Sequence, residues 1–115
     1  MTHPTDRAAP HQTLDALVAE AQAATEVLPT IDRCRHLDTQ LRDAIRDLHA
    51  RVEEKAAGLP PRSRAWYACV TLTDRTEDVL AGSLGYGLLS AATRVAALAR
   101  HCRALTDASE AMNGR

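Results

Sequence analysis

The sequence predicts an all-α fold, an antiparallel four-helix bundle preceded by a disordered N-terminal tail. Two observations support this prediction. Ala and Leu are the commonest residues and the best helix formers, whereas aromatic residues make up only 3% of the chain and Phe is absent. Apolar residues recur every three or four positions in four separate segments, and Pro or Gly residues stand between the segments.

We expect three regions along the chain: a flexible tail over residues 1–12, a bundle domain over residues 13–110 and a frayed C-terminus over residues 111–115. At 115 residues the chain can build one hydrophobic core but not two. The tail is polar and lacks the apolar stretch of a signal peptide. No segment approaches the roughly 18 apolar residues of a membrane span. We therefore expect a cytoplasmic protein with no membrane partner.

The first two predicted helices are separated by Pro29. Thr13 can cap the first helix and Thr30 the second, which continues to about Ala57 before Gly58 ends it. The apolar stripe of the first helix is Leu14, Leu17, Val18, Ala21, Ala24 and Leu28, and that of the second is Ile31, Cys34, Leu37, Leu41, Ile45, Leu48 and Val52. Ion pairs at helical spacing indicate that the opposite face of the second helix is solvated: Asp38 with Arg42, Asp43 with Arg46, and Asp47 with Arg51. As an alternative, Pro29 only kinks one long helix, giving a three-helix hairpin; the fresh cap at Thr30 favours a break.

The third predicted helix begins after Ser63 and ends at Gly82, and the fourth spans about residues 88–108. The stripe of the third helix is Trp66, Cys69, Val70, Thr73, Thr76 and Leu80, and that of the fourth is Leu88, Ala91, Ala92, Val95, Leu98, Ala99, Cys102 and Leu105. The glycine-rich segment 82–87 follows no strand and has no phosphate-loop Lys, so it predicts a turn between helices. Short connections favour antiparallel packing. We expect Leu72, Val79 and Leu89 to leave an apolar edge that a homodimer would cover.

The order of these features resembles a known family. The motifs are Leu28-Pro29, Val52-Glu53, Gly58-Leu59-Pro60, Ala65-Trp66, Gly85-Tyr86-Gly87-Leu88, Ser90-Ala91 and Leu98-Ala99-Arg100. They resemble, over about residues 13–110, a family of small actinobacterial helical proteins of unknown function, common in streptomycetes and associated with natural-product biosynthesis. Many members carry a Leu-Cys-Asp-His-Tyr-Glu run where this chain has residues 105–110, Leu-Thr-Asp-Ala-Ser-Glu. The Cys and His of that run are replaced here, which favours a structural or binding role.

The cysteines and histidines do not predict a metal or catalytic site. Cys34 and His36 are two positions apart and His101 and Cys102 are adjacent, so neither pair can bind one ion from a regular helix face. Cys34, Cys69 and Cys102 fall in apolar stripes, where we expect buried, reduced thiols. His36, His49 and His101 are expected to be solvated beside the stripes. We predict no catalytic residue, metal or cofactor.

Charge and aromatic residues bear on the choice of partner. With 14 basic and 15 acidic residues the net charge is −1, which gives no reason to expect nucleic acid. Arg94, Arg100 and Arg103 spread around the fourth helix and are expected to form a solvated face.

Trp66 and Tyr67 are adjacent, so one should face the core and the other the surface; an exposed Tyr67 near Tyr86 would anchor a partner. The candidate binding residues are Trp66, Tyr67, Tyr86, Arg100 and Arg103.

The sequence favours a non-enzymatic accessory or regulatory protein that binds a protein partner through a helical face, with a homodimer as one form. The resemblance implies a link to natural-product biosynthesis. The alternative is a small-molecule-binding bundle or unusual tailoring enzyme, with an internal pocket lined by Trp66 near Cys69, Thr73 and Thr76. A nucleic-acid-associated regulator is the third and least favoured reading.

Overall fold

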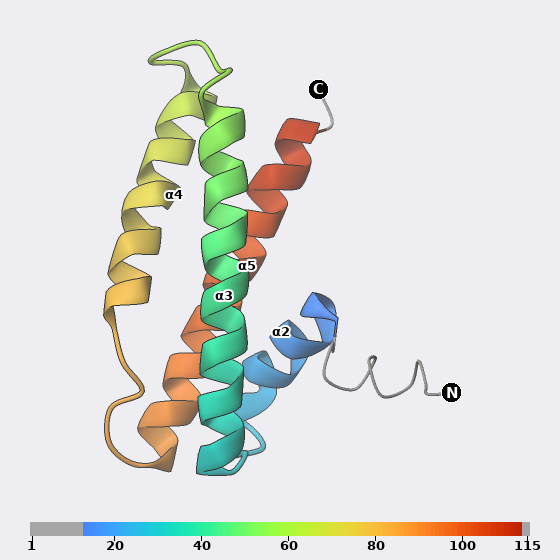
Figure 1. The fold of residues 1–115 in the computed structure, drawn as a ribbon, viewed down its shortest axis with the longest axis vertical. Coiled ribbons are helices and arrows are strands. Elements are labelled where there is room, and N and C mark those ends of the chain that lie inside the picture. Colours follow the sequence, from blue (N-terminus) through green and yellow to red (C-terminus); the bar gives the residue numbers. More distant parts are fainter. Residues whose placement is uncertain (1–12, 114–115) are drawn as a thin grey trace.

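The computed structural model describes residues 13–113. This part of the chain holds four α-helices, one 3-10 helix and no strand: α2 (Leu14–Gln22), η1 (Ala23–Thr25), α3 (Ile31–Ala56), α4 (Arg64–Ala81) and α5 (Leu88–Asn113) (Figure 1). The predicted all-α fold is confirmed for these residues. None of these helices combines the length and apolar character needed to cross a bilayer. The tail predicted over residues 1–12 lies outside the described residues, as do residues 114–115.

Local capping interactions fix the helix starts. The hydroxyls of Thr13, Thr30 and Ser63 accept hydrogen bonds from the backbone N–H three residues on, at 3.1, 3.0 and 3.2 Å. Each bond satisfies one of the amides that a helix N-terminus leaves without a partner. Between η1 and α3 the chain is not helical. The break at Pro29 is therefore confirmed, and the single kinked helix is wrong.

Two helix ends differ from the expectation. The first helix was expected to reach Leu28, but the α-helix ends at Gln22 and the Leu28 side chain is 49% exposed. The last helix was expected to end near Ala108, but it continues through Asn113. A tertiary contact supports this extension, because Lys55 Nζ donates hydrogen bonds to the backbone oxygen and Oγ of Ser109 at 3.1 and 3.0 Å.

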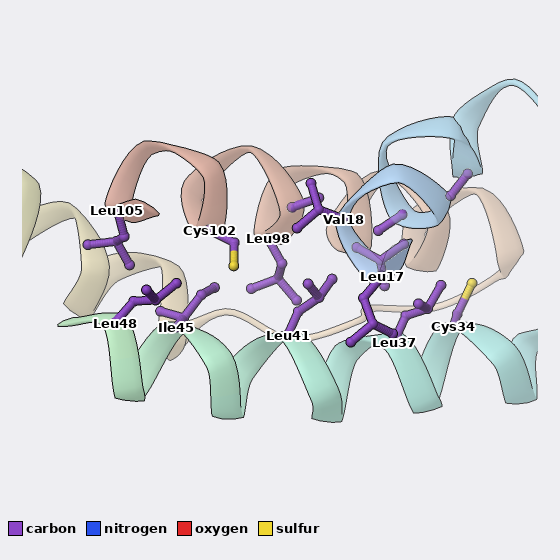
Figure 2. Close-up of a cluster of buried hydrophobic side chains, with 14 of the residues drawn as sticks. Leu17, Val18, Cys34, Leu37, Leu41, Ile45, Leu48, Leu98, Cys102 and Leu105 are labelled. Atoms are coloured by element: carbon purple, nitrogen blue, oxygen red, sulfur yellow. The ribbon is translucent and has the colours of Figure 1, made fainter. Parts of the chain in front are cut away.

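The core lies where α2 and α3 pack against α5. Figure 2 shows the side chains of α3 projecting toward those of α5 and α2. The fully buried aliphatic residues include Leu37, Leu41, Ile45 and Val52 of α3 and Val95, Leu98 and Leu105 of α5. From α2, Leu17, Val18 and Ala21 complete the cluster. Leu41 and Val95 therefore point inward as predicted, and apolar burial along this seam is the main source of stability.

Helix α4 packs along α3, on the side away from α2 (Figure 1). Only Cys69 and Thr76 of α4 are buried. Val70 is 38% exposed, so its predicted place in the core-facing stripe is wrong; it lies 100° round the helix from Cys69, outside the buried arc. Leu72 and Val79 are partly buried and pack against the core, so the expected apolar edge is also wrong. Of that edge only Leu89 is exposed, at 65%.

Candidate functional site

A groove of about 280 Å³ lies between the C-terminal part of α3 and the N-terminal half of α4. Its lining residues are Glu53, Ala56, Ala57, Trp66, Cys69, Val70, Thr73 and Asp74. Most of the lining is apolar, and the two carboxylates belong to exposed residues, one on each helix. This combination suits an apolar side chain that has a cationic group nearby.

Trp66 and Tyr67 differ in exposure, as their adjacent positions predict. Trp66 is half-buried and lines the groove, whereas Tyr67 is 53% exposed. The two rings meet edge to face, with centroids 5.0 Å apart and planes at 76°. Aromatic rings pack favourably in this geometry, so the indole is held in place at the groove while the phenol remains accessible.

The structure does not bring Tyr67 and Tyr86 together. Tyr67 lies in the first turn of α4, and Tyr86 lies beyond the other end of that helix and is fully exposed. An 18-residue helix is about 27 Å long. The expectation that Tyr67 lies near Tyr86 is therefore wrong.

The arginines of α5 fall into two kinds. Arg100 and Arg103 are exposed, and Arg103 lines a polar hollow beside α2 together with Asp15 and Asp107. Neither residue lines the α3–α4 groove. Arg94 was expected on the same solvated face, but its side chain is only 12% exposed, so that expectation is wrong.

Arg94 and Arg42 bind the C-terminal end of α4. Arg94 Nη2 donates to the backbone oxygens of Val79 and Gly82, the latter at 3.2 Å. Arg42 Nη1 donates to the oxygen of Leu80 at 2.7 Å, and its Nη2 donates to that of Gly82. A helix leaves its last carbonyls without intrahelical partners, and these two guanidinium groups supply the donors.

Asp38 supplies the counter-charge at this end of α4. Both of its carboxylate oxygens accept hydrogen bonds from Arg42 Nε, at 3.2 and 3.1 Å. The Asp38 and Arg42 side chains are 16% and 19% exposed, so the expectation of a solvated pair is wrong here. Burial lowers the pKa of Arg94, and the positive charge of Arg42 acts in the same direction. The cluster is a structural clamp on the end of α4.

His101 links α5 to α4 inside the fold. Its predicted solvated position is wrong, because the residue is buried and its Nε2 lies 2.6 Å from Thr76 Oγ1. Thr76 Oγ1 also donates to the backbone oxygen of Leu72 at 2.8 Å. Since the hydroxyl has one proton and donates it to Leu72, the threonine oxygen accepts a hydrogen bond from His101 Nε2–H. This assignment places a proton on His101 Nε2, as in one of the two neutral tautomers.

The surroundings of His101 favour that neutral form. Burial lowers the pKa of His101, and the nearby His49 and Arg75 lower it further. His49, on α3, is half-buried, and its Nε2 has no hydrogen-bond partner and lies 3.8 Å from a carboxylate oxygen of Glu53. His36 is exposed, as predicted. The buried imidazole is therefore a neutral contact between helices.

The three cysteines are free and buried, as their stripe positions predict: Cys34, Cys69 and Cys102. Burial raises the pKa of each thiol, for Cys102 to about 11. Thiols with raised pKa values stay protonated at neutral pH, and the thiol is a much poorer nucleophile than the thiolate. Within residues 13–113 no group of three His, Cys, Asp or Glu side chains is placed to hold a metal ion.

A comparison of the sequence with protein-family models decides the family. The model described as "Family of unknown function (DUF6415)" matches residues 8–114. The chain belongs to this family. No curated protein and no solved structure matches the chain. The sequence-based resemblance to a family of unknown function is confirmed to that extent.

Sequence reasoning missed the polar anchors of α4 in this DUF6415 protein. The signal for one of them was present, because Thr76 occupies a position in an otherwise apolar stripe, and a buried hydroxyl needs a partner. The second anchor, formed by Arg42 and Arg94, could not be predicted from neighbouring residues in the sequence, because the acceptors are carbonyls at the end of a different helix. Of the five candidate residues, Trp66 lines the groove, and the others are exposed: Tyr67, Tyr86, Arg100 and Arg103.

Proposed function

We propose that this DUF6415 chain is a non-enzymatic protein that binds a protein partner, and that the partner docks a helix in the α3–α4 groove. The observation that supports this proposal is the groove itself, which is lined by Trp66 and Val70 and bordered by the exposed Tyr67. Grooves between helices commonly receive the apolar face of an amphipathic helix. Half-buried aromatic residues beside such grooves are frequent centres of binding energy.

The charges at the groove suggest the chemistry of the partner. Glu53 and Asp74 line it from opposite helices. A partner helix with one large apolar side chain, flanked by Lys or Arg, would fill the apolar floor and place its cations beside these carboxylates. The buried, protonated thiols and the neutral His101 support a binding role over nucleophilic catalysis.

The proposal also includes three expectations from the sequence, which concern the arrangement of the helices, the biological role and the cellular location. It keeps the antiparallel four-helix arrangement, in which α4 is the helix with an accessible side. The resemblance described above supports an accessory role in actinobacterial natural-product biosynthesis, carried out in the cytoplasm. A strain that lacks the protein but has an unchanged natural-product profile would count against this role.

The test uses two matched charge insertions. Val70→Glu places a carboxylate in the groove beside Glu53 and Asp74, and Leu89→Glu does the same at an exposed apolar position of α5 outside the groove. Proteins captured from the native host by the wild type would be purified, and their affinities measured by calorimetry. We expect Val70→Glu to weaken binding at least about tenfold and Leu89→Glu to leave it unchanged. Equal affinity for the wild type and Val70→Glu would refute the groove as the binding site.

A small-molecule ligand at the same groove is the second candidate. Its volume is just below the range of about 300–1,000 Å³ that is usual for ligand pockets. Trp66, Cys69 and Thr73 line it, but it is a groove at the surface and not the internal pocket that the sequence suggested, and Thr76 does not line it. Binding of apolar fragments can be followed through Trp66 fluorescence, because the chain contains one Trp. Saturable quenching that Val70→Glu abolishes, without any captured protein, would favour this candidate over the protein partner.

A further inference from the structure

We propose that a second copy of this chain packs on the outer stripe of α4, with the two α4 helices antiparallel across a two-fold axis near Thr71. The outer stripe is the set of exposed residues spaced three and four apart on the side of α4 opposite Cys69 and Thr76: Arg64, Tyr67, Thr71, Asp74 and Asp78. This proposal rests on a different observation from the groove, the arrangement of charge along α4, and the two surfaces share Asp74.

The charges of α4 are segregated in the order opposite to the one that a single helix prefers. Arg62 and Arg64 lie at its N-terminus, and Asp74, Glu77 and Asp78 lie toward its C-terminus. Arg75 is the one cation among these acidic residues. The first turn holds no acidic residue and the last turn no basic residue. The helix dipole favours acids at the N-terminus and bases at the C-terminus, so the helix's own side chains oppose the dipole at both ends. At the C-terminal end Arg42 and Arg94 supply the favourable positive charge from other helices.

Helix α3 of the same chain shows the usual arrangement. Its exposed charges form ion pairs along the helix: Asp32 with Arg35, Asp43 with Arg46, and Asp47 with Arg51. Arg64, Asp74 and Asp78 have no such ion pair or side-chain hydrogen bond with any residue in 13–113. In addition, Asp74 and Asp78 are four positions apart, a spacing at which like charges repel. Arg64, Asp74 and Asp78 are therefore exposed and free to form ion pairs with a second chain.

A second α4 in antiparallel orientation supplies partners of opposite charge or hydrogen-bond donors for these exposed side chains. Arg64 is seven residues before Thr71 and Asp78 is seven residues after it, so a two-fold axis at Thr71 places each Arg64 opposite Asp78 of the other copy. The same pairing places the Tyr67 hydroxyl near Asp74 of the other copy, where it can donate a hydrogen bond. Small Thr71 side chains at the axis allow the helices to approach. The basic end of each helix then lies beside the acidic end of its copy, and the contact is closed and self-complementary.

The strength of this contact is limited, because exposed ion pairs add little affinity and mainly set orientation. We expect a dissociation constant on the order of 10–100 µM that increases with salt concentration. Sedimentation equilibrium of the full chain from about 5 µM to about 500 µM covers this range.

Charge exchange tests the pairing. Arg64→Glu and Asp78→Arg each create two like-charge contacts in the dimer, so each should weaken association at least about tenfold. The double variant restores opposite charges and should return the dissociation constant to within about threefold of the wild type. Arg100→Glu, an equal charge change at an exposed position of α5, should have no effect. Arg64→Glu should not lower the Tm, because an acid in the first turn is favourable, and this separates lost association from misfolding.

Several outcomes would overturn the inference: a monomer at the highest concentration, single variants that associate like the wild type, or a double variant no better than the singles. Each of these leaves the groove proposal standing, because that proposal is tested by Val70→Glu and a captured partner. Conversely, equal partner affinity of the wild type and Val70→Glu, with the expected charge-exchange behaviour, would remove the groove proposal alone.

Discussion

Where α3 and α5 face each other, their side chains are aliphatic and fully buried, whereas α4 buries only Cys69 and Thr76 against the same pair. Polar contacts hold α4 at two places. One is the hydrogen bond between Thr76 and His101, and the other is the pair of guanidinium groups from Arg42 and Arg94 at the C-terminal end of the helix.

This difference predicts that α4 can open locally, whereas the core between α3 and α5 opens only when the protein unfolds. The aliphatic packing is lost only when the whole core opens, because many small contacts contribute together. A few directional hydrogen bonds can break together and be replaced by water, so α4 should open at a lower free energy than the α3–α5 pair. Such an element is suited to present a partner surface.

The largest expected effect lies in the aliphatic seam. Leu98→Ala removes a fully buried side chain from α5 and should lower the free energy of unfolding by about 2–5 kcal/mol, because a cavity remains. Leu89→Ala, at a mostly exposed position of the same helix, should change it by less than about 0.5 kcal/mol. Urea denaturation measures both. Similar losses for the two variants would contradict the assignment of the core.

A smaller effect is expected at the end of α4. Arg94→Met keeps the apolar stem but removes the donors to Val79 and Gly82, and should cost about 1–3 kcal/mol. Amide exchange should accelerate in the last turns of α4 and not in α3. Arg100→Met is the matched control at an exposed arginine. If Arg94→Met were as stable as the control, the clamp would have no structural role.

Thr76→Val should cost less, about 1–2 kcal/mol, because the shape is kept while the hydrogen bonds of the hydroxyl to His101 and to the Leu72 oxygen are lost. The exposed Thr93→Val serves as control, with an expected change within about 0.5 kcal/mol. The free energy of unfolding is again measured in urea. Equal stability of the two variants would indicate that the Thr76–His101 contact does not hold α4.

The smallest expected effect is a dependence on pH. Burial lowers the pKa of His101 below its ordinary value of 6.5. Between the folded pKa and pH 6.5, His101 is therefore protonated in the unfolded chain and neutral in the folded chain. The contribution of His101 to the free energy of unfolding is fully present above pH 6.5 and is lost as the pH falls from 6.5 toward the folded pKa. The Tm should therefore drop by a few degrees between about pH 7.5 and pH 5.5.

His101→Gln serves as the control for this prediction, since it cannot titrate. Its Tm should depend less on pH than that of the wild type over the same interval, and an NMR titration of the His101 ring should give a midpoint below 6.5. An identical pH dependence in the two proteins would exclude His101 as its source.

The local features of the fold could be predicted from the sequence, because their causes are local. A hydroxyl at Thr30 or Ser63 needs only the next turn of backbone to act as a cap. The predicted end of the third helix at Gly82 is also observed. The apolar stripes of α3 and α5 were predicted for the same reason. Of the candidate site, the contrast between Trp66 and Tyr67 followed from their adjacency.

The remaining features depend on how many neighbours cover each helix, which periodicity does not reveal. Helix α5 is covered by α2, α3 and α4, so its buried arc is wide enough to include His101. Helix α4 has neighbours on one side only, so its buried arc is narrow and excludes Val70. The sequence placed Arg94 on the surface for a similar reason. Its hydrogen-bond acceptors lie on α4, and helical periodicity does not reveal which helix packs beside Arg94.

Native-state hydrogen exchange tests the central claim most directly. At a protein concentration below about 5 µM, the account predicts that amides of α4 exchange through openings at least about 2 kcal/mol below those of the buried parts of α3 and α5. Equal protection of all three helices, lost only by global unfolding, would contradict it.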